Sequence, residues 1–223
     1  EYNREFVCAS ITNRSWYQYS QSENRWKEVE EGTYLRRIVS GEFRERFVLL
    51  RKHIYDQLRE LDDKVEENAL NNRLKNVSQM MRNLDTTSFK NNVMRECAEE
   101  FYDTTFKEKL DTNPAIIGFQ NGVYDLEKNI FRNGEPTDYI SRTLPVEYKS
   151  GFNLDHPQVR NVYSFLEQVF PDRPLREYFL NYAADLLYGG NRRKEVSFWT
   201  GEGDNGKSVT EQLLGDLFGG LSV

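Results

Sequence analysis

The sequence predicts an α/β protein: a mainly helical N-terminal domain with a small β-sheet, followed by the truncated start of a second α/β domain. Three observations support this fold class. Apolar residues recur at helical intervals through much of the first half. Short apolar runs separated by turn residues follow between 115 and 148. A glycine-rich loop at 201–208 lies between a predicted strand and a predicted helix. The polar stretch 151–157 marks a boundary between domains of residues 1–150 and 151–223.

The composition is that of an ordinary soluble protein. Of the 223 residues, 38% are hydrophobic and 30% are charged, which leaves enough apolar surface for a core. No apolar run reaches the roughly 18 residues of a membrane span, so we expect no membrane segment. The formal net charge of −6 argues against a chain that mainly wraps nucleic acid through bulk positive charge. It leaves room for a basic channel within an acidic protein.

The cysteines and histidines indicate no metal or catalytic centre. Cys8 and Cys97 lie far apart without metal-ligand spacing, and we interpret them as reduced thiols of a cytosolic protein. His53 and His156 are equally isolated. The opening EYNREFVCAS has neither an initiator methionine nor the layout of a secretory signal, so we expect the sequence to be part of a longer protein.

The first predicted elements are a hairpin and long helices. Aromatic residues on both sides of SQSEN, at 20–24, predict two strands around a turn: Trp16, Tyr17, Tyr19 and Trp26. Such rings can stack on bases, but we favour packing within a small sheet. Apolar spacing then predicts helix over 33–61, divided at Gly41, and over 62–85. We interpret the basic residues here as a solvated helix face rather than a nucleic-acid patch: Arg36, Arg37, Arg44, Arg46, Arg51 and Lys52.

A further helix and a second sheet are expected before the boundary. Ser88 is the predicted N-cap of a helix that ends at Asn113-Pro114 and has the apolar stripe Phe89, Val93, Cys97, Phe101 and Leu110. Three runs near turn pairs then predict strands: AIIGF at 115–119, GVYDL at 122–126 and RTLPVEY at 142–148.

Two helices, a strand and a final helix are expected beyond the boundary. The helices have apolar faces over 159–169 and 175–186, and Gly189-Gly190 is expected to stop the second. Residues 196–199, VSFW, form the predicted strand before the glycine-rich loop, and 209–218 form the predicted helix after it.

The loop G-E-G-D-N-G-K-S carries the strongest chemical signal. Glycines let backbone N–H groups approach a phosphate closely, and the following helix adds its positive N-terminal end. In G-x-x-x-x-G-K-[ST] the lysine reaches the β- and γ-phosphates and the hydroxyl binds Mg²⁺. Lys207 and Ser208 are therefore the predicted catalytic residues, with Ser208 as the magnesium ligand. The predicted ATP-binding residues are Gly201, Glu202, Gly203, Asp204, Asn205, Gly206, Lys207, Ser208 and Val209.

Hydrolysis needs groups that this sequence does not supply. An ATPase of this kind requires an acidic strand residue after the loop, for Mg²⁺ and the attacking water. Asp185 precedes the loop and Asp216 lies within the predicted helix after it, so neither fits this role. We therefore expect this stretch alone to bind ATP weakly and not to hydrolyse it.

Several motifs together resemble one family. NPAIIGFQNGVYDL at 113–126, DYISRTLPVEY at 138–148 and the asparagine of G-D-N-G-K-S resemble the poxvirus-type primase-helicases of large DNA viruses, members of helicase superfamily 3. The resemblance extends from about residue 15 to the end. It implies a helical lead-in or collar domain followed by the start of a P-loop, AAA+-like ATPase domain.

The resemblance also implies a function. It points to a homo-hexameric, ATP- and Mg²⁺-dependent DNA helicase of viral replication in the host cytoplasm, which moves 3′-to-5′ and contacts DNA mainly through segments beyond this sequence. Two alternatives remain open. One is a non-enzymatic oligomerisation or DNA-binding module with an inactive loop. The other is a different P-loop enzyme such as a kinase, although kinases usually carry the loop near their own N-terminus.

Overall fold

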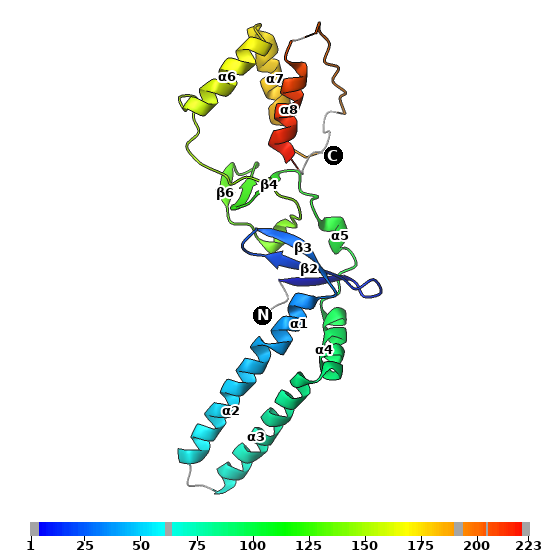
Figure 1. Ribbon diagram of the computed structural model, residues 1–223, viewed down its shortest axis with the longest axis vertical. Helices are drawn as coiled ribbons and strands as arrows, with labels where there is room; N and C mark the ends of the chain where they lie inside the picture. Colours follow the sequence, from blue (N-terminus) through cyan, green and yellow to red (C-terminus); the bar gives the residue numbers. More distant parts are fainter. Residues whose placement is uncertain (1–4, 61–63, 190–193, 204, 220–223) are drawn as a thin grey trace. The chain divides into compact units, whose positions relative to one another are not determined.

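The computed structural model describes residues 5–60, 64–189, 194–203 and 205–219 (Figure 1). The chain divides into two units. The first unit contains Glu1–Gln18 and Glu28–Lys107, and the second contains Tyr19–Lys27 and Glu108–Val223. Helices predominate, and the described residues also form two three-stranded sheets. The predicted mixed, mainly helical α/β class is confirmed.

A small sheet begins the chain. Its strands are β1 (Phe6–Ser10), β2 (Ser15–Ser20) and β3 (Arg25–Glu30), in that order, so the predicted hairpin is confirmed. The sequence reasoning missed β1, because only two of its five positions, Phe6 and Cys8, are buried and the alternation is too short to stand out. Trp16 and Trp26 are each 3% exposed, so these rings pack and offer no face to bases.

The long helices of the first unit follow the predicted pattern. α1 (Thr33–Ser40) and α2 (Glu42–Glu60) are separated at Gly41, and α2 runs beside α3 (Lys64–Asp85) (Figure 1). Ile54 is fully buried and clusters with Val77 and Met81 between these two helices. Arg44, whose side chain is 41% exposed, pairs with Asp85 across the helices at 2.7 Å, as expected of a solvated basic face.

Helix α4 (Thr87–Glu100) differs from the prediction at both ends. The extended N-cap is Thr86, so Ser88 lies inside the first turn. The helix ends at Glu100, far before 113–114, because the backbone beyond it pairs with β1. The N–H of Cys8 donates to the carbonyl of Phe101 (2.9 Å), and the N–H of Asp103 donates to the carbonyl of Cys8 (3.1 Å). A single-turn helix, α5 (Phe106–Lys109), follows.

Both cysteines are free thiols in the first unit. Cys8 is fully buried in a cluster with Phe6, Trp16 and Leu35, and the half-buried Cys97 packs against it. Burial raises the pKa of each thiol, and for Cys97 nearby glutamates raise it further. Both therefore stay protonated and unreactive near neutral pH.

The sheet of the second unit contains β4 (Ile116–Phe119), β5 (Gly122–Asp125) and β6 (Ile130–Arg132), paired antiparallel. The first two predicted strands are confirmed, but the third, at 142–148, is wrong. Leu144 donates its N–H to Gly118 (2.8 Å), and Val146 accepts one from Gln120 (3.1 Å). Pro145 has no N–H between these contacts, so the segment borders β4 without forming a regular strand.

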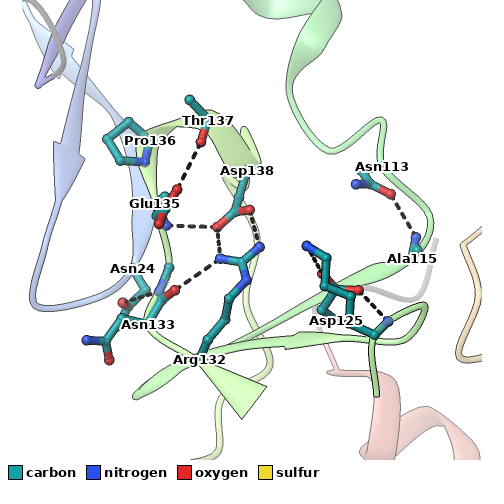
Figure 2. A network of polar contacts seen from close by, with 12 residues as sticks. Asn24, Asn113, Ala115, Asp125, Arg132, Asn133, Glu135, Pro136, Thr137 and Asp138 are labelled. Carbon is teal, nitrogen blue, oxygen red and sulfur yellow. Dashed lines mark hydrogen bonds and ion pairs between the residues drawn. The ribbon is translucent and has the colours of Figure 1, made fainter. Parts of the chain in front are cut away.

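A polar network holds the turn after β6 (Figure 2). The Arg132 guanidinium binds both carboxylate oxygens of Asp138, at 2.8 and 2.6 Å, and this carboxylate raises the pKa of Arg132. The same Asp138 accepts the N–H of Glu135 (2.8 Å). From the β2–β3 turn, Asn24 accepts the buried N–H of Gly134 (2.9 Å). Side chains thus fix the conformation of this turn, whose sequence contains the turn-forming pairs Asn133-Gly134 and Glu135-Pro136.

The remaining helices are α6 (Pro157–Val169), α7 (Arg173–Asp185) and α8 (Lys207–Phe218). All three were predicted, although α8 begins two residues early and α7 ends before Gly189; Gly190 lies outside the described residues. His156, which the sequence left without a role, caps α6 by accepting the N–H of Gln158 at 3.3 Å. Among the helices that the structure describes, none combines the length and the apolar character that a membrane crossing requires.

The predicted strand at 196–199 is wrong for the described structure. The segment is irregular, and Val196 and Phe198 are 76% and 85% exposed. A strand needs neighbouring backbone to pair with. None of the strands in the described part of the chain pairs with this segment.

Candidate phosphate-binding loop

The glycine-rich loop joins the irregular segment 194–200 to helix α8. Its residues 201–203 and 205–208 are described, and the predicted ATP-binding residue Asp204 lies outside the described residues. Glu202, Asn205, Ser208 and Val209 are exposed, whereas Gly206 and Lys207 are half-buried.

Lys207 closes the loop on itself. Its ammonium donates to the carbonyls of Gly201 (3.1 Å) and Glu202 (3.0 Å) and to Oδ1 of Asn205 (2.7 Å). These three acceptors match the three donors of an ammonium group. The ammonium of the predicted phosphate-binding lysine therefore contacts both the start of the loop, at Gly201 and Glu202, and its later part, at Asn205.

The start of α8 leaves further donors without a side-chain cap next to the loop. Among the described residues, the backbone bonds of α8 begin with the N–H of Thr210, which donates to the carbonyl of Gly206 at 2.9 Å. The N–H groups of Lys207, Ser208 and Val209 precede it and have no acceptor within the helix. The N-cap is Gly206, which has no side chain to cap them. Together with the helix dipole, these groups favour an anion.

Two glycines of the motif have close contacts around the position of a Cβ. Gly206 has φ +79°, in the left-handed region, and a Cβ there would lie 2.7 Å from Cγ2 of Val169 at the end of α6. A Cβ on Gly201 would collide with the amide of Asn205. Gly203 is different, because a Cβ there would meet nothing within 4 Å. The loop thus depends on glycine at Gly206, whereas the contact at Gly201 is with the far end of the Asn205 side chain, which can move.

Thr210 is a supporting residue that the sequence reasoning missed. Its side chain is fully buried, and its hydroxyl donates to the carbonyl of Gly206 at 2.9 Å. This second bond to the same carbonyl fixes the first turn of α8 behind the loop. The only signal in the sequence is a threonine four residues after the last glycine of the motif.

A cleft of about 770 Å³ adjoins the loop. Aromatic side chains of α7 and of residues 195–200 line it, and Asn205 and Lys207 lie at its edge. Phe179, 7% exposed, stacks on Phe170 with ring centroids 4.7 Å apart and meets Trp199 edge-on at 5.8 Å. The sequence reasoning read the α7 aromatics as a packing face and did not identify this cleft.

Acidic side chains are absent from the lining of the cleft except for Glu195, as far as the described residues go. Asp185 and Asp216 lie on α7 and α8, as predicted. Among the described residues, no group of three or more His, Cys, Asp or Glu side chains is placed to hold a metal ion. The predicted magnesium ligand, the exposed hydroxyl of Ser208, lies in the first turn of α8.

Comparisons with known proteins give relatives in several large DNA viruses. "Putative helicase L207/L206" of Acanthamoeba polyphaga mimivirus is 33% identical over 227 residues, which cover 100% of this chain and 23% of the relative. "Putative helicase 121R" of Invertebrate iridescent virus 3 is 37% identical over 147 residues, which cover 66% of this chain and 16% of the relative. "Putative primase C962R" of African swine fever virus is 23% identical over 197 residues, which cover 87% of this chain and 20% of the relative.

These likenesses place the chain in the class of helicase- and primase-named proteins of large DNA viruses. A family model described as "D5 N terminal like" matches residues 1–171. The chain belongs to this family, and the predicted resemblance to viral primase-helicases is confirmed. The chain spans 16% to 32% of the length of the first four relatives. The family model ends before the glycine-rich loop.

Proposed function

We propose that this chain is the ATP-binding portion of a viral replicative DNA helicase, with the phosphates held by residues 201–209. The observation that carries the proposal is a loop in which the Lys207 ammonium contacts Gly201, Glu202 and Asn205, directly before a helix whose N-terminus has no side-chain cap. The family match over residues 1–171 and the names of the relatives support the helicase part.

Each residue has a defined task in this proposal. Lys207 exchanges its neutral oxygen acceptors for charged phosphate oxygens, which form stronger hydrogen bonds. The N–H groups at the start of α8 bind the same phosphates. The hydroxyl of Ser208 is one ligand of the Mg²⁺ that ATP carries. That ion would neutralise phosphate charge during hydrolysis.

The aromatic cleft is the proposed site of the base and ribose. Its volume of about 770 Å³ falls within the range of small-molecule sites, and Lys207 lies at its edge. Tyr182 and Trp199 have ring centroids 6.5 Å apart in this cleft, so a planar base could pack beside them. The same nucleotide would then contact the cleft and the loop together.

The properties of the whole protein follow from the same proposal. We infer a homo-hexameric ring that couples ATP hydrolysis to unwinding of DNA, at viral replication sites in the host cytoplasm. The comparisons do not favour a non-enzymatic module with an inactive loop, nor a different P-loop enzyme such as a kinase.

Binding of a fluorescent ATP analogue with Mg²⁺ tests the loop. Lys207→Ala removes a charge-assisted bond worth about 1.5–3 kcal/mol, so affinity should fall about 10- to 100-fold. The control is Lys149→Ala, which removes an exposed lysine of the same unit. Equal affinity of Lys207→Ala and the control would contradict the site assignment. Loss of affinity on removal of Mg²⁺ from the unsubstituted chain is the further expected result.

A further inference from the structure

The first unit contains a cavity of about 650 Å³ that plays no part in the proposed nucleotide site. Residues of the β1–β2 turn, the start of α1 and one face of α4 line it, together with Trp16 of β2. The turn, α1 and α4 each contribute one arginine, Arg14, Arg36 and Arg95 respectively. We call this feature the arginine cavity.

Positive charge predominates in the arginine cavity. Glu31 is the only carboxylate among its described lining residues, and it pairs with Arg14 at 2.9 Å. Arg36 donates to the side-chain oxygen of Asn91 at 2.7 Å, which leaves its charge uncompensated. Within the described residues, the exposed guanidinium of Arg95 has no hydrogen bond or ion pair. A local excess of positive charge therefore exists in a chain with a net charge of −6.

The walls of the arginine cavity are built by close packing. Gly32, at φ +65° before α1, is so tightly enclosed that a Cβ there would lie 2.9 Å from Met94 and 3.2 Å from Trp16. Met94 and Trp16 also line the cavity. The backbone that leads into α1 thus packs closely against Trp16 and Met94 at one wall of the cavity.

The chemistry of the lining selects the ligand. Guanidinium groups match the geometry of phosphate oxygens, and Asn91 and Asn92 supply neutral amide groups beside them. The one aromatic residue among the described lining residues, Trp16, is 3% exposed, so it offers no face on which a base could stack. The cavity is therefore suited to a sugar-phosphate backbone rather than to a base.

We propose that the arginine cavity binds the phosphate backbone of a DNA strand. This interaction is separate from the ATP site, because it uses other residues of another unit. It adds a DNA contact in the N-terminal region, whereas the helicase resemblance implies contacts mainly beyond this chain.

Fluorescence anisotropy with labelled single-stranded oligo-dT tests the proposal on the whole chain. Arg95→Ala should weaken binding about tenfold and lower the slope of log affinity against log salt by about 0.7, the share of one phosphate contact on a single strand. Arg36→Ala should have a similar effect. The matched control is Arg73→Ala on α3, which removes an exposed arginine outside the cavity. The affinity of this variant for the oligonucleotide should change by less than about twofold.

Further arms separate DNA from other phosphate ligands. Excess ATP with Mg²⁺, or inorganic phosphate at the same ionic strength, should not displace the oligonucleotide, and Lys207→Ala should bind it normally. Arg95→Lys keeps the charge, so its salt slope should stay unchanged even if Arg95→Ala destabilises the unit. Displacement by ATP at low concentration would assign the cavity to free nucleotides and overturn the proposal. Equal binding by Arg95→Ala, Arg36→Ala and Arg73→Ala would also overturn it.

Discussion

Substitution of Gly206 by alanine tests whether the loop geometry depends on its contact with α6. The left-handed conformation of Gly206, φ +79°, costs a residue with a Cβ about 1–2 kcal/mol. The new methyl would also lie 2.7 Å from Cγ2 and 3.3 Å from Cγ1 of Val169. Such overpacking adds about 1–3 kcal/mol. Gly206→Ala should therefore destabilise the packing of the loop and α8 against α6 by about 2–5 kcal/mol in total.

The two contributions can be separated with a second substitution. Val169→Ala removes the side chain that the new methyl meets, but it leaves the backbone conformation of residue 206 unchanged. The double variant should therefore be more stable than the two single effects predict, by about 1–3 kcal/mol. Gly203→Ala is the matched control, because a Cβ there meets nothing within 4 Å. Its effect should stay within about 0.5 kcal/mol.

Hydrogen exchange of the α8 amides is the suitable assay, because it reports on local opening within one of two units. Gly206→Ala should speed exchange in α8 and weaken binding of the ATP analogue, and adding Val169→Ala should partly restore the exchange rates. Equal exchange in Gly206→Ala and Gly203→Ala would refute the reasoning. Additive effects of Gly206→Ala and Val169→Ala would show that the α6 contact does not constrain the loop.

Three further predictions concern the rest of the fold. Asn24→Ala leaves the buried N–H of Gly134 without its acceptor, so thermal unfolding should show a loss of about 1–3 kcal/mol, whereas Asn24→Asp should lose less. Cys8 should react with a thiol reagent only on unfolding and Cys97 only slowly, since burial raises both pKa values; rapid labelling of either in the folded protein would contradict this. The carboxylate of Asp125 accepts a backbone N–H that holds its pKa below the ordinary value. Its contribution to stability is therefore present above about pH 4 and lost as the pH falls through the lower, folded pKa, so Asp125→Asn should flatten the acid dependence of the melting temperature.

The sequence predicted best those elements whose signal is local and repeated. Apart from the end of α4, the helices with apolar residues at every third or fourth position were located to within a few residues, and so were the strands predicted at 115–119 and 122–126. The end of α4 was missed, because it depends on pairing between Phe101 and Cys8, which are distant in sequence. The 142–148 segment was misread because its alternation is that of a strand, while Pro145 prevents continuous pairing.

The candidate loop shows the same division between local and distant information. The motif located Lys207 and Ser208, because phosphate binding needs those residue types at that spacing. It did not reveal the buried Thr210, the aromatic cleft or the contact of Gly206 with Val169. Each of these depends on which helix lies against the loop, and a pattern of neighbouring residues carries no such information.

The contact between Val169 and Gly206 also joins the region that matches the family to the phosphate-binding motif. Family membership extends over residues 1–171 and so includes Val169, at the end of α6, while the phosphate-binding pattern begins thirty residues later, at Gly201. Arg176 of α7 holds this end of α6 by donating to the carbonyl of Phe170 at 2.8 Å. The family region therefore supplies the surface against which the loop is shaped. A substitution at Val169, at the end of α6, should therefore change nucleotide affinity although every residue of the motif stays the same.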